Sequence, residues 1–446
     1  MTSLSERIEA REGRRWGRPA AGAAGRAGGR RRSNHLQTLY GQAGRHANSL
    51  DRLSQRGRRP AGGPLIALCP ADLPPSPAPL RAPGGFTWFY VDLVDDQGQA
   101  ATLIWSWGLP FLPGYASAAR AGRAQLPLDR PSVNLVLYSN GQERFYLLSE
   151  LPAEAATWGA DGRSWQLGGC RFTWVDEAAA DGGAPTRALE ATLDLPLPTG
   201  GRAQGRLWLR GPLRRDPAQA TGATTAAEDP GCTHKWTPMV AAGAGGLDLR
   251  WPGGEATLRG RAYHDRNSAE QPLHALGIQS WWWGRLALPG RELIFYQLLP
   301  AAPGARPRDL VVEITDQGAT RVQEDAGLQV RHLQRSLWGL SWPRAAHFPD
   351  PDGARVEVRV EAVLDDGPFY QRYLLHGRCG DQTGRGIGEN VVPDRVDTDL
   401  LRPLVSMRVH RSAGPNSMWL PLFSGDRRGR WPRLLGLRAD PSGAAG

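Results

Sequence analysis

The sequence predicts an all-β protein built as barrels or sandwiches, with one β domain on each side of a seam near residues 241–246 and a disordered basic arm before them. Short stretches rich in aromatic and β-branched residues recur from residue 84 onward. The 446 residues include 56 glycines and 37 prolines, which favour turns. Helical periodicity is nearly absent. Many short strands joined by frequent turns indicate sandwiches or barrels.

Residues 1–80 form the predicted arm, which is rich in arginine and glycine and then in proline. This composition buries too little apolar surface to offset the entropy lost on ordering. Residues 1–60 contain 14 arginines and four acidic residues, which account for the whole formal charge of +10. Because the remainder is neutral, we expect no nucleic-acid partner. An electrostatic tether to anionic lipid is the functional alternative for the arm.

The N-terminal β domain is placed at residues 81–243. Residues 86–92 and 101–107 are aromatic and β-branched strands. Residues 133–139 and 142–148 flank Asn140-Gly141, the two-residue sequence that favours a type I′ hairpin turn. A stretch rich in glycine, alanine and threonine at residues 218–228 is predicted to be a loop insertion.

The C-terminal β domain is placed at residues 244–430 and is followed by a tail at residues 431–446. It begins with a hairpin in which strands at residues 247–251 and 255–263 flank Pro252-Gly253-Gly254. Further strands are expected at residues 292–299, 310–315, 320–323 and 355–364.

Two short segments carry most of the chemistry. His234 and Trp236 share one side of an extended stretch, as do Tyr263 and Asp265, so each pair offers a ring and a proton-handling group. Burial beside tyrosine and tryptophan should raise the pKa of the carboxylic acid, so that it holds a proton at neutral pH. Such an acid suits protonation of an unactivated double bond, because electron-rich rings stabilise the resulting cation. The alternative is the solvated face of an ordinary strand.

Trp281-Trp282-Trp283-Gly284-Arg285 is the second unusual stretch. Its tryptophans either fill two layers of the core or line a hydrophobic ligand cavity, and the sequence leaves both open. We expect Arg285 to pair with a buried carboxylate such as Asp265.

Trp88, Tyr90 and Asp92 alternate along the first aromatic strand and form another group of candidate cavity residues. Gly384-Arg-Gly386-Ile-Gly388 is glycine-rich, but no helix is expected after it, so a phosphate cradle is not favoured.

The chain lacks H-E-x-x-H, G-x-S-x-G and Walker sequences and shows no histidine and cysteine cluster with metal-ligand spacing. Nothing therefore requires a metal or a cofactor, although a triad assembled from distant residues stays open. The four cysteines are widely spaced, which favours free thiols in a reducing compartment. The first residues lack the apolar core of a secretory signal, so we expect a cytoplasmic protein.

At these residues the chain resembles the carotenoid 1,2-hydratase (hydroxyneurosporene synthase) family. The blocks that match, in order, are Gly84-Gly-Phe-Thr-Trp88-Phe-Tyr90-Val-Asp92, Leu109-Pro-Phe-Leu-Pro-Gly114-Tyr115, His234-x-Trp236-x-Pro238, Tyr263-x-Asp265-x-Asn267, Trp283-Gly-Arg285 and Asp365-Asp-Gly-Pro-Phe-Tyr370. The resemblance covers roughly residues 84–411. It implies two lipocalin-like β-barrel or sandwich units, with the active pocket near their junction.

The resemblance also implies a cofactor-independent hydratase that adds water across the terminal C1=C2 bond of an acyclic carotenoid through a carbocation. Asp265 would protonate C2, Trp236 and Tyr263 would stabilise the cation at C1, and His234 would position or deprotonate the attacking water. The expected substrate-binding residues are Trp88, Tyr90, Asp92, Trp283 and Arg285. Because the hydrophobic polyene resides in the bilayer, we expect transient peripheral contact with the inner membrane face.

Two alternatives stay open at this point. Tyr263-His264-Asp265 is shared with relatives that are cyclases or pericyclase-like enzymes, and Arg266 and Ala269 depart from the residues common in hydratases. An isomerase or cyclase of a polyene natural product is therefore one alternative. A non-catalytic carrier of a hydrophobic ligand is the other.

Overall fold

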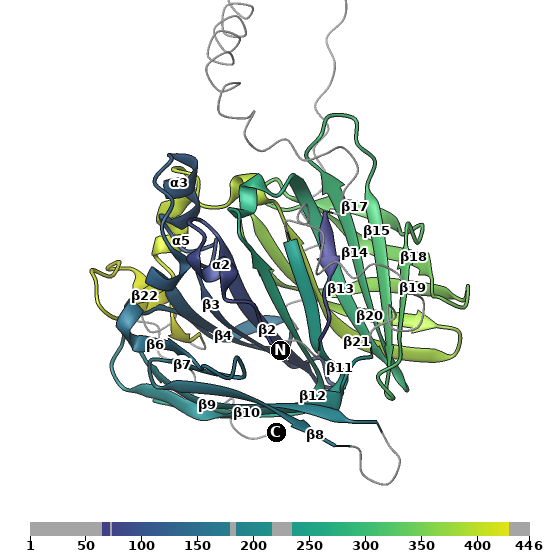
Figure 1. Ribbon diagram of the computed structural model, residues 1–446, viewed down its shortest axis with the longest axis horizontal. Helices are drawn as coiled ribbons and strands as arrows, with labels where there is room; N and C mark the ends of the chain where they lie inside the picture. The colour runs from purple at the N-terminus through teal and green to yellow at the C-terminus, as the bar shows by residue number, and fades with distance from the viewer. Residues whose placement is uncertain (1–64, 72–73, 179–183, 216–233, 428–446) are drawn as a thin grey trace, which may run out of the picture. The chain divides into compact units, whose positions relative to one another are not determined.

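Two largely antiparallel β-sheets contain most of the regular structure (Figure 1). The computed structural model describes residues 65–71, 74–178, 184–215 and 234–427, all of which belong to one unit, Ala61–Gly446. In this described part of the chain, no helix has both the length and the hydropathy needed to span a membrane. The predicted all-β class is confirmed.

The first sheet contains 14 strands, which follow one another along the chain except for the last two. They are β1 (Ile66–Leu68), β2 (Phe86–Val94), β3 (Ala100–Trp107), β4 (Pro131–Ser139), β5 (Gln142–Glu150), β6 (Ala156–Trp158), β7 (Ser164–Leu167), β8 (Cys170–Glu177), β9 (Thr186–Pro196), β10 (Arg202–Pro212), β11 (His234–Trp251), β12 (Gly254–Ala269), β22 (Val409–Arg411) and β23 (Gly425–Asp426). Their order is β22-β5-β4-β3-β2-β12-β11-β10-β9-β8-β7-β6, with β1 beside β11 and β23 beside β5.

The second sheet contains nine strands. They are β13 (Ile278–Leu288), β14 (Arg291–Pro300), β15 (Arg308–Thr315), β16 (Thr320–Glu324), β17 (Gln329–Arg335), β18 (Ser341–Pro349), β19 (Arg355–Asp366), β20 (Tyr370–Cys379) and β21 (Gln382–Val391). Their order is β16-β15-β14-β13-β21-β20-β19-β18-β17. The helices are short: α2 (Ala78–Arg81), α3 (Tyr115–Arg120), α5 (Arg402–Ser406), α6 (Leu420–Phe423), and the 3-10 turns η3 (Pro127–Asp129), η4 (Ala153–Ala155), η6 (Leu273–Ala275) and η7 (Pro393–Arg395).

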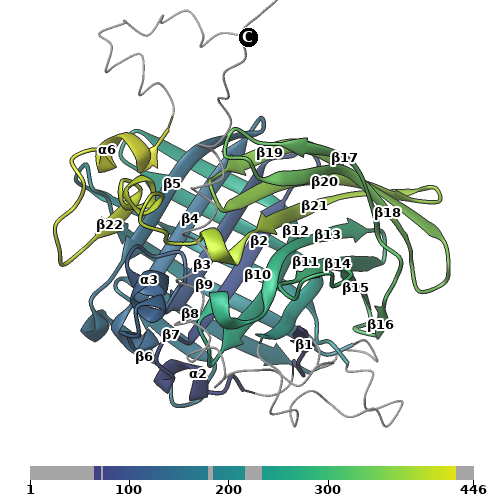
Figure 2. The same cartoon turned by 90° about the horizontal axis from the view of Figure 1, so that it is seen from above.

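The central strand β2 is buried on both faces. Phe89 and Leu93 pack into a core on one side, whereas Trp88 and Tyr90 join a second core that also contains Trp283 of the other sheet. One strand serves both cores because alternate side chains point to opposite faces. β2 contacts β21 and β5 contacts β19, so the two sheets face each other over the second core (Figure 2).

A buried ion network joins the two sheets. Arg285 of β13 donates from Nε to Asp92 Oδ1 of β2 at 2.8 Å and from Nη1 to Glu292 Oε1 of β14 at 2.6 Å. The other Glu292 oxygen accepts the backbone N–H of Ala242 in β11 at 2.7 Å. All three charged side chains have 0% exposure. Unpaired charges are costly in such surroundings, so the network ties the position of β13 and β14 to that of β2 and β11.

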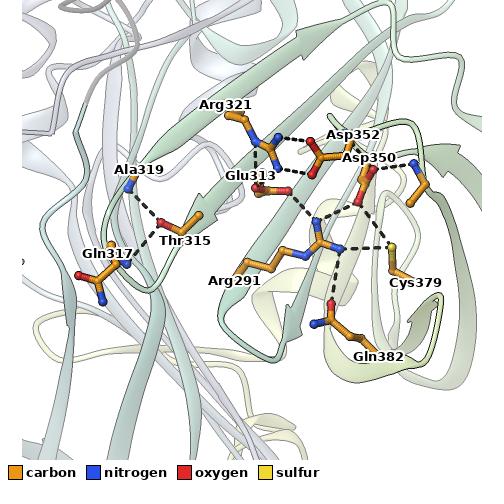
Figure 3. A network of polar contacts seen from close by, with 11 residues as sticks. Arg291, Glu313, Thr315, Gln317, Ala319, Arg321, Asp350, Asp352, Cys379 and Gln382 are labelled. Carbon is orange, nitrogen blue, oxygen red and sulfur yellow. Dashed lines mark hydrogen bonds and ion pairs between the residues drawn. The ribbon is translucent and has the colours of Figure 1, made fainter.

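A second ion network connects distant strands of the second sheet (Figure 3). Arg291 of β14 donates to Glu313 of β15 at 2.8 Å and to Asp350, just after β18, at 2.9 Å. Arg321 of β16 donates to Glu313 at 3.1 Å and to Asp352 at 2.8 Å. Four strands lie between β14 and β18 in the sheet order, so these contacts require the sheet to curl. The three carboxylates have a spacing that would also suit a metal ion, but each already has an arginine partner, which indicates a structural role.

Most of the predicted strands are confirmed and extend by a few residues. The predicted strands at residues 86–92 and 101–107 correspond to β2 and β3. In the first predicted hairpin, Asn140 has φ 52° and Gly141 has φ 71°, and a type I′ turn requires positive φ at both positions. The second predicted hairpin is formed by β11 and β12, which are much longer than expected.

The predicted disordered arm extends too far, because residues 65–71 and 74–80 are part of the folded unit. Ile66–Leu68 pairs in parallel with β11, so that Ile66 lies opposite His234 and Leu68 opposite Trp236. Leu65 and Ile66 are buried in the core between the sheets. This short apolar run gains its burial from a strand far along the chain, which local composition does not reveal. Residues 1–64, the loop at 218–228 and the tail at 431–446 lie outside the described residues.

The strand β11 passes without interruption through the boundary predicted between residues 243 and 244. Residues 244–269 pair within the first sheet, and the second sheet begins at Ile278. The chain therefore changes sheet between Ala269 and Ile278, while its division into two domains stays a prediction.

We expect Arg285→Leu to lower the free energy of unfolding by about 3–5 kcal/mol, because it leaves Asp92 and Glu292 buried without their cation. Urea denaturation followed by tryptophan fluorescence measures this change. Arg250→Leu is the matched control, since Arg250 pairs with Glu255 through side chains that are 86% and 75% exposed. It should cost less than about 1 kcal/mol. Equal losses in the two variants would contradict the role given to the buried network.

Candidate active site

Asp265 of β12 is the centre of a hydrogen-bonded cluster. Its Oδ2 accepts hydrogen bonds from Trp236 Nε1 and from the Tyr263 hydroxyl, both at 2.9 Å. Its Oδ1 accepts the Asn267 side-chain N–H at 2.9 Å. The Asn267 carbonyl oxygen in turn lies 3.1 Å from His234 Nε2. The cluster therefore brings together all four residues predicted to be catalytic.

The register of two strands explains this arrangement. Tyr263, Asp265 and Asn267 alternate along β12 and so share one face. Trp236 of β11 lies opposite Asn267, from where its indole reaches diagonally to Asp265. The alternation inferred from the sequence is confirmed.

Burial gives Asp265 an unusual protonation state. Removal from water raises the pKa of its carboxyl group to about 8, and the charges of Glu389 and Asp92 add to this rise. The hydrogen bonds from Trp236 and Tyr263 oppose it. Asp265 is therefore mostly protonated at neutral pH and can act as a general acid.

The two other titratable groups of the cluster are uncharged at neutral pH. Burial raises the pKa of the Tyr263 hydroxyl well above its usual value, and the charge of Asp265 adds to this effect. Burial lowers the pKa of His234 to about 4, although its hydrogen bond with Asn267 opposes the change. The cluster thus holds one transferable proton on Asp265 beside a neutral imidazole.

Asp265 faces a small cavity of about 30 Å³, which has room for a water molecule. The lining is mostly aromatic and includes two carboxyl groups. Its residues are Trp88, Tyr90, His234, Asp265, Asn267, Trp281, Trp283, Tyr296 and Glu389.

A larger cavity of about 650 Å³ adjoins the small one. Trp88, Tyr90, Trp281 and Glu389 line both. The remaining walls are largely apolar and include Ile104, Leu109, Phe111, Tyr146, Leu148, Leu364, Phe369, Val391, Leu404, Val405, Met407 and Phe423. This volume is typical of sites for small apolar ligands. A long apolar ligand in the large cavity would place one end near Asp265.

A single row of paired residues connects the acid to the large cavity. Across the first sheet, Asp265 lies opposite Tyr90, Tyr90 opposite Ile104, Ile104 opposite Asn134 and Asn134 opposite Leu148. All five residues line at least one of the two cavities. One row of the first sheet therefore runs along the floor of the site, with the acid at one end.

The predicted substrate-binding residues fall into two groups. Trp88, Tyr90 and Trp283 line the cavities. Asp92 and Arg285 line neither cavity. The Arg285 guanidinium lies 5.8 Å from the centre of the Tyr263 ring. The predicted pairing of Arg285 with Asp265 is wrong, because Arg285 pairs with Asp92 and Glu292. Among the described residues no cation pairs with Asp265, so no ion pair opposes the rise of its pKa.

His264 points to the opposite face of β12, away from the acid. Its Nδ1 lies 2.7 Å from the backbone oxygen of Tyr90, and its Nε2 accepts the indole N–H of Trp174 at 2.9 Å. Burial lowers the pKa of His264 to about 3. These contacts suit a neutral imidazole that donates from Nδ1, so His264 has a structural role.

Several cavity residues were missed by sequence reasoning. Trp281 has the same alternation as Trp283 and could have been included on that signal. Tyr296 and Glu389 lie opposite Trp283 on the two neighbouring strands. Only the pairing of the strands reveals them.

The chain matches the family model described as "Carotenoid hydratase CrtC" over residues 104–417. Three curated relatives have similar sequences. The acyclic carotenoid 1,2-hydratase of Thiocapsa roseopersicina is 28% identical over 80% of this chain and 78% of its own length. The acyclic carotenoid 1,2-hydratase of Rubrivivax gelatinosus is 24% identical over 74% of each chain. A hydroxyneurosporene dehydrogenase of Chlorobaculum tepidum is 26% identical over 76% of this chain and 91% of its own.

Among solved structures, a putative AttH from Nitrosomonas europaea has a TM-score of 0.48 and 14% identity, and the match covers 75% of this chain and 98% of that one.

The raised pKa of Asp265 predicts a specific dependence of stability on pH. Between about pH 4 and pH 8 the native protein keeps a proton that the unfolded chain releases, so this group lowers stability by about 1.4 kcal/mol per pH unit as the pH rises. Asp265→Asn should remove this slope. Urea denaturation at pH 5 and pH 7 measures it, with the exposed Asp248→Asn as the control. The idea fails if Asp265→Asn and wild type show the same pH dependence.

Proposed function

The chain belongs to the carotenoid hydratase CrtC family, and from this premise we propose that it adds water across the terminal C1=C2 double bond of an acyclic carotenoid by acid catalysis. The observation that carries the proposal is an acid which holds its proton at neutral pH, placed in an aromatic pocket beside a large apolar cavity. Proton transfer and water addition balance without a redox step, so the proposed reaction uses no cofactor.

In the proposed reaction the Asp265 proton moves to C2, and the electron pair of the double bond forms the new C–H bond. This leaves a tertiary cation at C1. Trp88, Trp283 and Tyr296 line the pocket with electron-rich rings that stabilise a cation. Trp236 and Tyr263 keep their hydrogen bonds to the carboxylate that forms, which favours transfer of the proton.

His234 is proposed to position the attacking water. It lines the same cavity as Asp265, and that cavity has room for a water molecule. The same acid could also start an isomerisation or a cyclisation, in which the cation loses a proton or meets a second double bond. Room for water beside the acid favours hydration over these alternatives.

We also propose that the protein works in the cytoplasm and touches the inner membrane face to collect its substrate. Segments that frame the large cavity carry exposed apolar side chains. Leu337 is 100% exposed beside the cavity residue Trp338, and Leu400 (84%) and Met418 (84%) precede α5 and α6. Exposed apolar side chains on segments that border the residues of an apolar cavity suit contact with a membrane.

Anaerobic incubation of the full chain with lycopene or neurosporene in detergent, followed by mass analysis, tests the hydration. We expect a product heavier by one water. Asp265→Asn should lower its rate of formation by at least about a hundredfold while the polyene still binds, because a general acid contributes about 10²–10⁴-fold. Asp248→Asn serves as the control.

An isomer of unchanged mass would instead support the cyclase or isomerase. Unchanged polyene despite demonstrated binding to the wild-type protein would support the carrier.

Flotation with phosphatidylcholine vesicles tests the membrane contact, because these vesicles have no net charge to attract the arginine-rich residues 1–60. We expect Leu337→Ser combined with Met418→Ser to reduce the floated fraction at least fivefold, since two apolar groups would no longer enter the interface. Val322→Ser, on β16, is the control, because Val322 is 38% exposed and lines neither cavity. Equal flotation of all three proteins would argue against the proposed contact surface.

A further inference from the structure

Glu389 of β21 is the second carboxyl group of the site, and it lines both the small and the large cavity. Glu389 and Asp265 are the two carboxyl groups that line the small cavity, and they come from different sheets. Asp265 comes from β12 of the first sheet and Glu389 from the second.

The register of the second sheet holds Glu389 in this place. Glu389 lies opposite Trp283 of β13 on one side and opposite Arg372 of β20 on the other. Residues directly opposite each other share a face, so Glu389 is directed to the cavity with Trp283 and Arg372. The row continues from Arg372 to Asp365, which also lines the large cavity.

The glycine-rich stretch before Glu389 allows this close pairing. A Cβ atom at Gly384 would lie 1.9 Å from the backbone oxygen of Ala287, and one at Gly386 would lie 1.8 Å from that of Arg285. Any side chain at these positions would push β21 away from β13. The Gly384-x-Gly386-x-Gly388 pattern therefore serves close strand packing, which sets the position of the residue that follows it.

The hydrogen bonds of Glu389 to described residues all go to one of its two carboxylate oxygens, Oε1. Arg372 donates to Oε1 from Nη2 at 3.0 Å and from Nε at 3.1 Å, and the Tyr370 hydroxyl donates to the same oxygen at 2.5 Å. Among the described residues, Oε2 accepts no hydrogen bond. Arg372 is itself held in place by the hydrogen bonds that its Nη1 donates to the hydroxyl oxygens of Thr102 and Tyr138 of the first sheet, both at 2.8 Å. Glu389 is thus an ion-paired carboxylate held firmly through Oε1, with Oε2 available to a water molecule.

We propose that Glu389 is a catalytic residue which accepts the proton of the attacking water through Oε2. This inference rests on the proposed hydration. Water forms the new C1–O bond with an oxygen lone pair, one of its O–H bonds breaks, and that proton passes to Glu389. Solvent water then returns the proton from Glu389 to Asp265, so each turnover consumes one polyene and one water. The negative charge of Glu389 also stabilises the cation before water attacks.

This assignment divides the chemistry between two carboxyl groups in different environments. In the part of the chain that the structure describes, Asp265 forms no ion pair and starts as the acid, whereas Glu389 forms an ion pair with Arg372 and starts as the base. A pair of carboxyl groups with different partners is a recurrent way to supply both an acid and a base at one site. His234 then positions the water without having to remove its proton.

Azide provides a direct test, because this anion attacks a carbocation without losing a proton. We expect Glu389→Gln and Glu389→Ala to lower hydration of lycopene or neurosporene at least about a hundredfold. Sodium azide should restore turnover of Glu389→Ala and give a product heavier by hydrazoic acid. It should not rescue Asp265→Asn, which forms no cation. Glu361→Gln, a change to a carboxylate on β19 that lines neither cavity, is the matched control.

Polyene binding and thermal unfolding of each variant show that it is folded, and Glu389→Gln keeps an oxygen that can accept from Arg372. Hydration by Glu389→Gln within about threefold of wild type would overturn the proposal. So would the absence of an azide product from folded, polyene-binding Glu389→Ala. If the wild-type protein itself makes no hydrated product, the proposed function fails first and the role of Glu389 fails with it.

Discussion

The buried ion pairs of Arg285 set the geometry on which the site depends. Arg285 belongs to the second sheet, yet it forms an ion pair with Asp92 of the first. Glu292 completes the network by accepting the backbone N–H of Ala242 in β11. Charges with 0% exposure hold their partners in a narrow range of positions, because separating them would leave a charge in an apolar medium. The network also lies against the Tyr263 ring, so it supports the side chain that hydrogen-bonds the acid.

The same network influences the chemistry of Asp265 from a distance. Arg285 is engaged by two carboxylates, and the Asp92 charge contributes to the raised pKa of Asp265. Had Arg285 paired with Asp265, as its position in the sequence suggested, the carboxyl group would be ionised and unable to protonate a double bond. By pairing with Arg285, Asp92 and Glu292 thus help Asp265 to keep its proton.

Facing rows of two sheets form the site. The first sheet supplies the acid and a largely apolar floor, and the second supplies Trp283, Glu389 and Arg372 along one row. The opposite face of β12 has a structural role, as His264 shows beside Asp265. Strict alternation therefore lets β12 carry the acid on one face and core packing on the other.

The sequence by itself determined the all-β class, the Asn140-Gly141 turn, and the placing of His234 with Trp236 and of Tyr263 with Asp265 on common faces, because these depend on alternation and turn chemistry within short segments. Tertiary structure decided the rest. The partner of Arg285, the inclusion of Ile66–Leu68 in the first sheet and the approach of Glu389 to the cavity all depend on strands distant in the chain. Local sequence does not specify which strands pair or in which register, since that choice is made by the burial of whole sheets against each other.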